Sequence, residues 1–156
     1  MMGRKEIHAR RTRLDQTFVR MPSSSADPEF QSDFARYLVV LVSGFLENSI
    51  EAILLEFAEK KSSPEVAAHV ARQLGFWTNP NCEKIILSLF GAFNSDWRDK
   101  LQNYIIDEKN DSINSLVALR HKVAHGDYVG TTLSQVKQYY KTIIDVVEFM
   151  NELVNP

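Results

Sequence analysis

Apolar residues recur every three or four positions along this chain, a spacing that restricts most of it to amphipathic helices. The longest such stretch runs from about Pro28 to Lys61, and a second runs from about 132 to 154. The first is apolar around more than one face in its first half, which predicts a helix at the centre of the fold. Apolar and polar residues alternate nowhere as they would in a half-buried strand. The sequence therefore predicts an all-α bundle with a long central helix and a long C-terminal helix.

Capping and turn residues divide the rest of the chain into shorter helices. We expect these at residues 2–20, 63–74, 81–93, 94–106 and 107–125. Ser63 and Thr132 carry the side-chain oxygen that an N-cap requires, and Asp27 should cap the long helix, with Pro28 at its first position. Serines and prolines between Pro22 and Pro28 predict a linker. The predicted organisation is a basic helix and linker over 1–27, followed by a helical domain over 28–156.

The charge of the chain is uneven, although its net value is only −2. Residues 1–20 hold six Lys or Arg against two acids, and the remainder holds twelve against eighteen. The helix at 2–20 places Ile7, Leu14 and Phe18 on one side, with cations around them. Those cations either contact RNA phosphates or remain solvated while the apolar side packs on the bundle. Without interleaved aromatic residues, the pattern favours packing.

Cysteine content and hydropathy indicate the cellular compartment in which the protein is expected. Cys82 stands alone, so no disulfide forms within the chain, which fits a reducing cytosol. A single cysteine of this kind is expected to be a small buried residue and not a nucleophile. The longest apolar run, from Tyr37 to Leu46, is about half of a membrane span, and the N-terminus lacks a secretory apolar region. We expect a cytoplasmic protein without a membrane segment.

The helix expected at 107–125 combines an arginine with two histidines near its end. At about 100° per residue, Arg120 falls inside an apolar arc. That arc comprises Ile113, Leu116, Val117, Leu119, Val123 and Ala124. His121 and His125 are four residues apart and share one border of the arc, while Lys122 points to water. Gly126 follows, where a helix ends in a left-handed conformation.

An arginine in an apolar arc must be paired, or must await contacts from a ligand or a second chain. The simplest interpretation is an arginine that extends to the surface and a histidine that acts as an ordinary C-terminal cap. Glu47, on the long helix, is either the buried partner of Arg120, part of an active site, or a surface carboxylate. The residues alone leave these alternatives open.

Arg120 and His125, with four residues between them and Gly126 after them, resemble the R-x4-H signature of the HEPN superfamily. Further segments of the chain resemble its RiboL-PSP-type branch: residues 38–47, residues 86–93 followed by Trp97, and the Thr132-Leu133 pair that opens the last helix. The resemblance covers roughly residues 30–154. It implies a HEPN-like helical bundle and a metal-independent endoribonuclease. It also implies a homodimer with a shared active site and products with 2′,3′-cyclic phosphate and 5′-hydroxyl ends.

The resemblance implies roles for individual residues. His125 is expected to be the principal acid and base, and Arg120 the clamp on phosphate and transition state. His121 would orient the substrate or assist. Glu47, Asn48 and Tyr128 are second-tier candidates, and Lys122 could flank the cleft. Arg120 and His125 lie about 140° apart on the wheel, which is awkward for one phosphate, whereas two antiparallel chains would place both pairs around one cleft.

Two further alternatives concern metals and catalysis. His121 and His125 have the spacing of two zinc ligands, but no third ligand sits at a convincing spacing and the glutamate of an H-E-x-x-H pair is absent. We therefore expect neither metal nor cofactor. The favoured function is the toxin or effector of a bacterial toxin–antitoxin or antiphage system, with RNA as substrate and an antitoxin as a possible partner. The alternative is a non-catalytic helical module that binds a nucleotide or protein partner.

Overall fold

The computed structural model describes residues 2–127 and 130–156, and within those ranges it contains helices and no strand. The elements are α1 (Met2–Val19), α2 (Pro28–Lys61), α3 (Pro64–Leu74), the π-helix η1 (Lys84–Phe90), α4 (Gly91–Phe93), α5 (Ser95–Tyr104), α6 (Glu108–Ala124) and α7 (Leu133–Val154). This confirms the predicted all-α fold with a long helix early in the chain and another at its C-terminal end.

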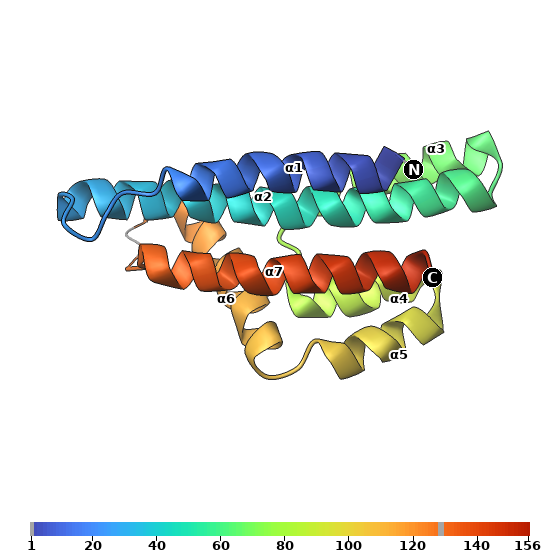
Figure 1. Cartoon of the computed structure of the whole chain (residues 1–156). Helices are drawn as coiled ribbons and strands as arrows, with labels where there is room; N and C mark the ends of the chain where they lie inside the picture. Colours follow the sequence, from blue (N-terminus) through green and yellow to red (C-terminus); the bar gives the residue numbers. More distant parts are fainter. Residues whose placement is uncertain (1, 128–129) are drawn as a thin grey trace.

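Helix α2 lies at the centre of the bundle. It runs beside α1 and packs against α3, α6 and α7, while α6 crosses behind α7 and brings its C-terminal end towards α2 (Figure 1). Residues on several faces of α2 are fully buried, among them Leu38, Leu46, Ile50 and Leu54. The breadth of this apolar surface explains why α2 contacts so many neighbours, as its sequence predicted.

Helix α7 supplies the other long apolar stripe. Val136, Tyr140, Ile143, Val147, Met150 and Val154 are buried, as the spacing of threes and fours predicted. The Thr132 side chain accepts a hydrogen bond from the backbone N–H of Gln135 at 3.1 Å, so the predicted N-cap is confirmed. Ser63 caps α3 in the same way through the N–H of Val66.

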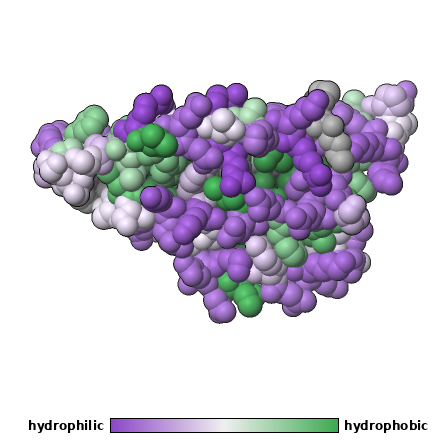
Figure 2. Space-filling view, in the orientation of Figure 1, coloured by the Kyte–Doolittle hydropathy of each residue, from purple (hydrophilic) through white to green (hydrophobic). Residues whose placement is uncertain are grey.

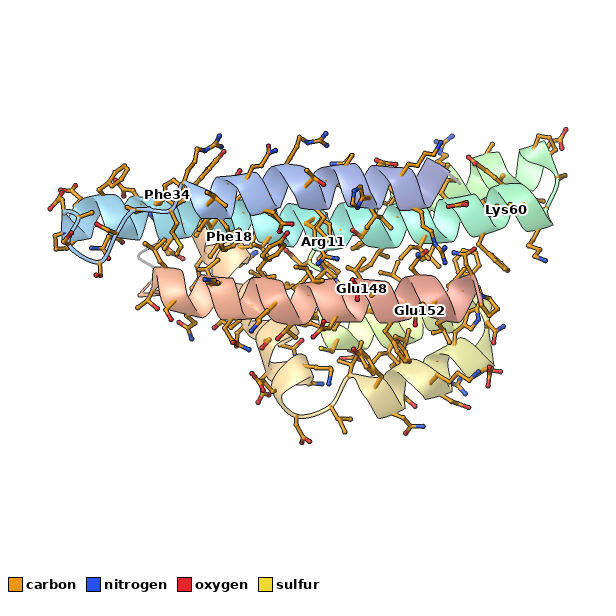
Figure 3. All side chains as sticks on the ribbon, in the orientation of Figure 1. Arg11, Phe18, Phe34, Lys60, Glu148 and Glu152 are labelled. Atoms are coloured by element: carbon orange, nitrogen blue, oxygen red, sulfur yellow. The ribbon has the colours of Figure 1, made fainter. Side chains whose placement is uncertain are left out.

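Helix α1 packs on the bundle through its apolar side. Leu14 is buried, and Ile7 and Phe18 lie partly buried against the core. The Phe18 ring stacks on Tyr140 of α7 with centroids 4.6 Å apart. One of its cations, Arg11, forms an ion pair at 2.8 Å with Glu148 of α7 (Figure 3). These contacts support the packing interpretation of the basic helix.

The visible face of the molecule is mostly hydrophilic. Figure 2 shows hydrophobic side chains gathered at the left of the view, over the first turns of α2 and the end of α1. Exposed apolar residues of these segments include Val19, Phe30 and Tyr37, with relative exposures of 85%, 53% and 52%. This apolar surface therefore lies where α2 extends beyond its neighbours.

By length and composition, α2 is also apolar enough to cross a membrane. The mean hydropathy of its best 18-residue window is 1.8, and 56% of that window is buried in the bundle. The uninterrupted apolar run from Tyr37 to Leu46 is shorter than this window, because isolated polar residues divide a longer apolar stretch. A core helix passes the same test of composition, and α2 has the contacts of a core helix.

The start of α2 differs from the prediction. Asp27 occupies the N-cap position and Pro28 the first turn, but the Asp27 side chain makes no capping hydrogen bond. The linker is held by Gln31 instead, whose amide donates to the carbonyls of Ser24 and Ala26 at 3.1 Å and 2.8 Å. The predicted capping bond was therefore wrong. Gln31 satisfies carbonyls of the linker and does not replace a cap on the first N–H groups of α2.

The helix expected at 81–93 forms largely as a π-helix, η1, followed by the single turn α4. The backbone N–H of Gly91 donates to the carbonyl of Ile86, five residues earlier. A Cβ added to Gly91 would lie 2.4 Å from that same oxygen. Apolar periodicity predicted this helix. It did not predict the π-helical hydrogen bonds, because they depend on a backbone contact at Gly91 that the pattern of apolar side chains does not reveal.

Candidate functional site

The motif helix α6 ends as its sequence predicted. Gly126 has φ of +75°. Its N–H donates to the Val123 carbonyl at 3.1 Å, and the N–H of Asp127 donates to the Lys122 carbonyl at 3.0 Å. This pair of bonds is the Schellman arrangement, which closes a helix through a left-handed glycine. His125 is thereby placed at the C-cap, with its backbone outside helical geometry.

The two histidines of this last turn lie against each other. The ring centroids of His121 and His125 are 4.3 Å apart, and the rings meet at 74°, edge to face. Both side chains are exposed. The four-residue spacing predicted this proximity, and the structure adds that both imidazoles remain accessible to a substrate.

Arg120 precedes this pair in sequence and is less exposed than either histidine. It is half-buried, and so is Glu47 on α2. Burial raises the pKa of the Glu47 carboxyl, the Arg120 charge opposes that rise, and Glu51 adds to it. The Arg120 charge thus acts on Glu47 across the α2–α6 interface, but it does not outweigh the effect of burial on the Glu47 pKa.

Only part of the apolar arc around Arg120 is buried. Ile113, Leu116 and Val117 are buried, but Leu119 and Val123 are only partly covered and Ala124 is exposed. Ala124 lies on the same arc but is exposed, because it belongs to the last turn of α6, where burial decreases. His121 and His125 are exposed in the same part of α6.

The second-tier residues do not all join this site. Asn48 lines a groove of about 320 Å³ between α1 and α2, together with Arg10, Arg13 and Gly44. It therefore faces the basic helix. Tyr128 lies outside the described residues, so its predicted role stays a prediction.

A groove beside His121 was not predicted from the sequence. It has a volume of about 530 Å³ and is lined by Asn79, Asn81, Glu83, Asn114, Val117, Ala118, His121 and Lys122. One of its walls is the loop before η1, where Asn79 has φ of +53°. The only sequence signal was the Asn79-Pro80-Asn81 turn, which does not reveal that the loop lies beside α6.

The described residues offer neither a metal cluster nor a reactive thiol beside these side chains. Within residues 2–127 and 130–156, no three His, Cys, Asp or Glu side chains gather as a metal site would require. Cys82 is buried, and burial raises the pKa of its thiol to about 11. At neutral pH the thiol is protonated, which argues against a nucleophilic role.

Family comparison agrees with this arrangement of helices. The model of the RiboL-PSP-HEPN family matches residues 6–156, a range that includes most of α1 as well as the motif helix. The chain belongs to this family. No curated protein and no solved structure matches it. Membership in the RiboL-PSP-HEPN family supports a HEPN-type module, whose chemistry then depends on the residues described above.

The raised pKa of Glu47 predicts how stability varies with pH. The folded state holds this proton more tightly than the unfolded state, whose carboxyl titrates near 4.5, so the wild type loses stability as pH rises through the folded-state pKa. Glu47→Gln removes that loss. We expect the variant to gain stability over the wild type on going from pH 4 to pH 7.5, measured as the free energy of unfolding in urea.

A matched control for this experiment is Glu59→Gln, an exposed carboxylate on the same helix. It should show no comparable gain across the same pH interval. If the difference in free energy of unfolding between wild type and Glu47→Gln stayed constant from pH 4 to pH 7.5, burial would not raise the pKa of Glu47.

Proposed function

We propose that this RiboL-PSP-HEPN protein is a metal-independent endoribonuclease. The observation that carries the proposal is the pair of exposed imidazoles at the end of α6, next in sequence to a half-buried guanidinium. Imidazole ordinarily titrates near neutral pH and can both accept and donate a proton in one reaction. Guanidinium holds phosphate oxygens in two-point contacts.

RNA supplies the nucleophile for this reaction. A base removes the proton of the ribose 2′-OH, and its oxygen attacks the adjacent phosphorus. The bond from phosphorus to the 5′-oxygen breaks, and an acid protonates that oxygen as it leaves. A cation stabilises the charge that develops on the phosphoryl oxygens. The products are a 2′,3′-cyclic phosphate and a 5′-hydroxyl end.

The chain offers a residue for each of these tasks. We assign proton transfer to His125, whose C-cap position leaves its ring exposed, and assistance or substrate orientation to His121, whose ring it touches. Arg120 is assigned to the phosphate. Glu47 keeps the guanidinium oriented by charge, as its electrostatic coupling to Arg120 suggests.

The site is proposed to be completed by a second copy of the chain. Within one chain, the His121 ring lies against that of His125, while the Arg120 charge acts on Glu47 of α2. Two antiparallel copies packed across the end of α6 would bring a guanidinium from one and an imidazole from the other to the same phosphate. We therefore propose a homodimer with a shared cleft.

The biological setting that suits such an enzyme is a toxin or effector of a bacterial toxin–antitoxin or antiphage system, acting on cytoplasmic RNA. A nuclease that needs no metal is active whenever it is folded, so we expect an antitoxin protein to restrain it. The family match supports the HEPN module from which this proposal starts.

The direct test is cleavage of total RNA by the purified protein in the presence of EDTA, followed on a denaturing gel. We expect fragmentation that EDTA does not prevent. Fragments should carry a 5′-hydroxyl, so polynucleotide kinase should label them without prior phosphatase treatment. RNA that stays intact, or cleavage that EDTA abolishes, would contradict the proposal.

One observation favours a second candidate function. The coupling of Arg120 to Glu47 is also what a purely structural pairing across α2 and α6 would produce. In that case the chain is a non-catalytic HEPN module that binds a nucleotide or a protein. Intact RNA across a range of substrates, together with a folded protein, would favour this alternative.

A further inference from the structure

The groove beside His121 has two different walls. One is the segment from Asn79 to Glu83, which precedes η1, and the other is the outer surface of α6 with Val117, Ala118 and Lys122. Its volume of about 530 Å³ accommodates a nucleobase with its sugar. Because His121 belongs to the lining, a base bound here would lie next to the proposed site of cleavage.

Three hydrogen bonds to backbone groups hold the first wall in place. The N–H of Asn81 donates to the Asn79 carbonyl at 2.8 Å, and Lys84 Nζ reaches the carbonyl of Thr78 at 2.7 Å. The Cys82 N–H donates to Asn114 Oδ1 on α6 at 3.0 Å, which ties the wall to the motif helix. A wall fixed in this way is preorganised for a ligand and loses little entropy on binding.

The hydrogen-bonding groups of this wall have a definite polarity. Asn81 Oδ1 accepts the backbone N–H of Lys84 at 2.9 Å, which orients the amide and leaves its NH₂ group as a donor. Glu83, two residues later, contributes an exposed carboxylate, which is an acceptor. Asn81 and Glu83 therefore present a donor and an anionic acceptor on this wall. Asn79 Oδ1 is a further acceptor, buried and without a hydrogen-bond partner, and Ala118 is among the α6 residues that line the groove.

We propose that this groove is a nucleobase subsite that selects guanine next to the cleaved bond. The inference rests on the proposed ribonuclease function. Guanine offers the O6 acceptor beside two donors, N1–H and the N2 amine, which match the amide of Asn81 and the carboxylate of Glu83. Adenine and cytosine place an amine where guanine has O6, and uracil offers the carboxylate only one N–H. Lys122 lies on the opposite wall, where it contacts the adjoining phosphate.

The experiment is cleavage-site sequencing on an RNA pool with randomised positions. The wild type should prefer guanine at one position beside the cut. Glu83→Gln and Asn81→Ala should each lower that preference by about 5- to 100-fold, while cleavage at sites without guanine changes little. Lys122→Ala should slow cleavage of all sequences to a similar extent. The matched control is Glu65→Gln, an exposed carboxylate on α3 outside the groove lining.

The outcomes separate this proposal from the ribonuclease function. Cleavage without base preference, a preference for another base, or a guanine preference unchanged in Glu83→Gln would overturn the subsite and leave the ribonuclease standing. Failure to cleave any RNA would overturn both. Glu83 is exposed, so its variant remains informative even if Asn81→Ala, which removes an acceptor for the Lys84 N–H, fails to fold.

Discussion

Replacing His125 with alanine should reduce RNA cleavage by about 10²- to 10⁴-fold, the usual contribution of a general acid or base. The side chain is exposed, and its backbone N–H, which bonds to the His121 and Lys122 carbonyls, is unaffected by the substitution. The free energy of unfolding should therefore change little. Single-turnover cleavage of a labelled RNA, alongside urea unfolding of the same preparation, measures both quantities.

The matched control is His69→Ala, which removes an exposed histidine from α3, a helix outside the proposed site. It should retain wild-type cleavage. Retention of full activity by His125→Ala would show that the imidazole does not transfer the proton.

His125→Ala also tests the shared cleft, in combination with Arg120→Ala. Arg120→Ala and His125→Ala should each lose most of the cleavage activity alone, and mixing the two variants should restore part of it. A mixed dimer keeps one intact Arg120 and one intact His125 on opposite chains. Absence of any recovery, with exchange of subunits demonstrated, would contradict a site built from both copies.

Replacing Gly91 with alanine should destabilise the protein by about 1–3 kcal/mol, the range for inserting an atom into a packed site. The new Cβ would meet the Ile86 carbonyl at 2.4 Å and the Arg98 side chain at 3.3 Å. The carbonyl accepts the Gly91 N–H in η1 and cannot move without breaking that turn. Differential scanning calorimetry should show Tm lowered by roughly 3–10 °C.

Gly44→Ala is the matched control, since Gly44 is also a glycine in a helix but a Cβ added there would meet no neighbouring atom within 4 Å. The variant should be neutral or stabilised by up to about 1 kcal/mol, because alanine favours helix. A wild-type Tm for Gly91→Ala would mean that the chain does not need the π-helical turn between η1 and α4.

Several features could be predicted from local sequence because their causes are local. The apolar spacing of α7, the Ser63 and Thr132 caps, and the left-handed Gly126 each depend on residues within a few positions of one another. The proximity of His121 and His125 follows from helical geometry in the same way. The absence of a capping bond from Asp27 was not predicted, although its residue type and its place before Pro28 are those of an N-cap.

Features that join distant segments could not be predicted. The α-helical period does not distinguish η1 from an ordinary helix, since the winding depends on which carbonyl the Gly91 N–H reaches. The groove beside His121 unites the loop at Asn79 with α6, two segments that only the packing of the bundle brings together.

The sequence by itself determined the helical class, the ends of most helices and the residues placed at the end of α6, because each reflects periodicity or capping within one segment. Only the tertiary structure decided that the Arg120 charge acts on Glu47, that Ala124 is exposed, and that a groove opens next to His121. The physical reason is that burial and charge coupling depend on which helix covers each face, and contacts between remote segments decide that coverage.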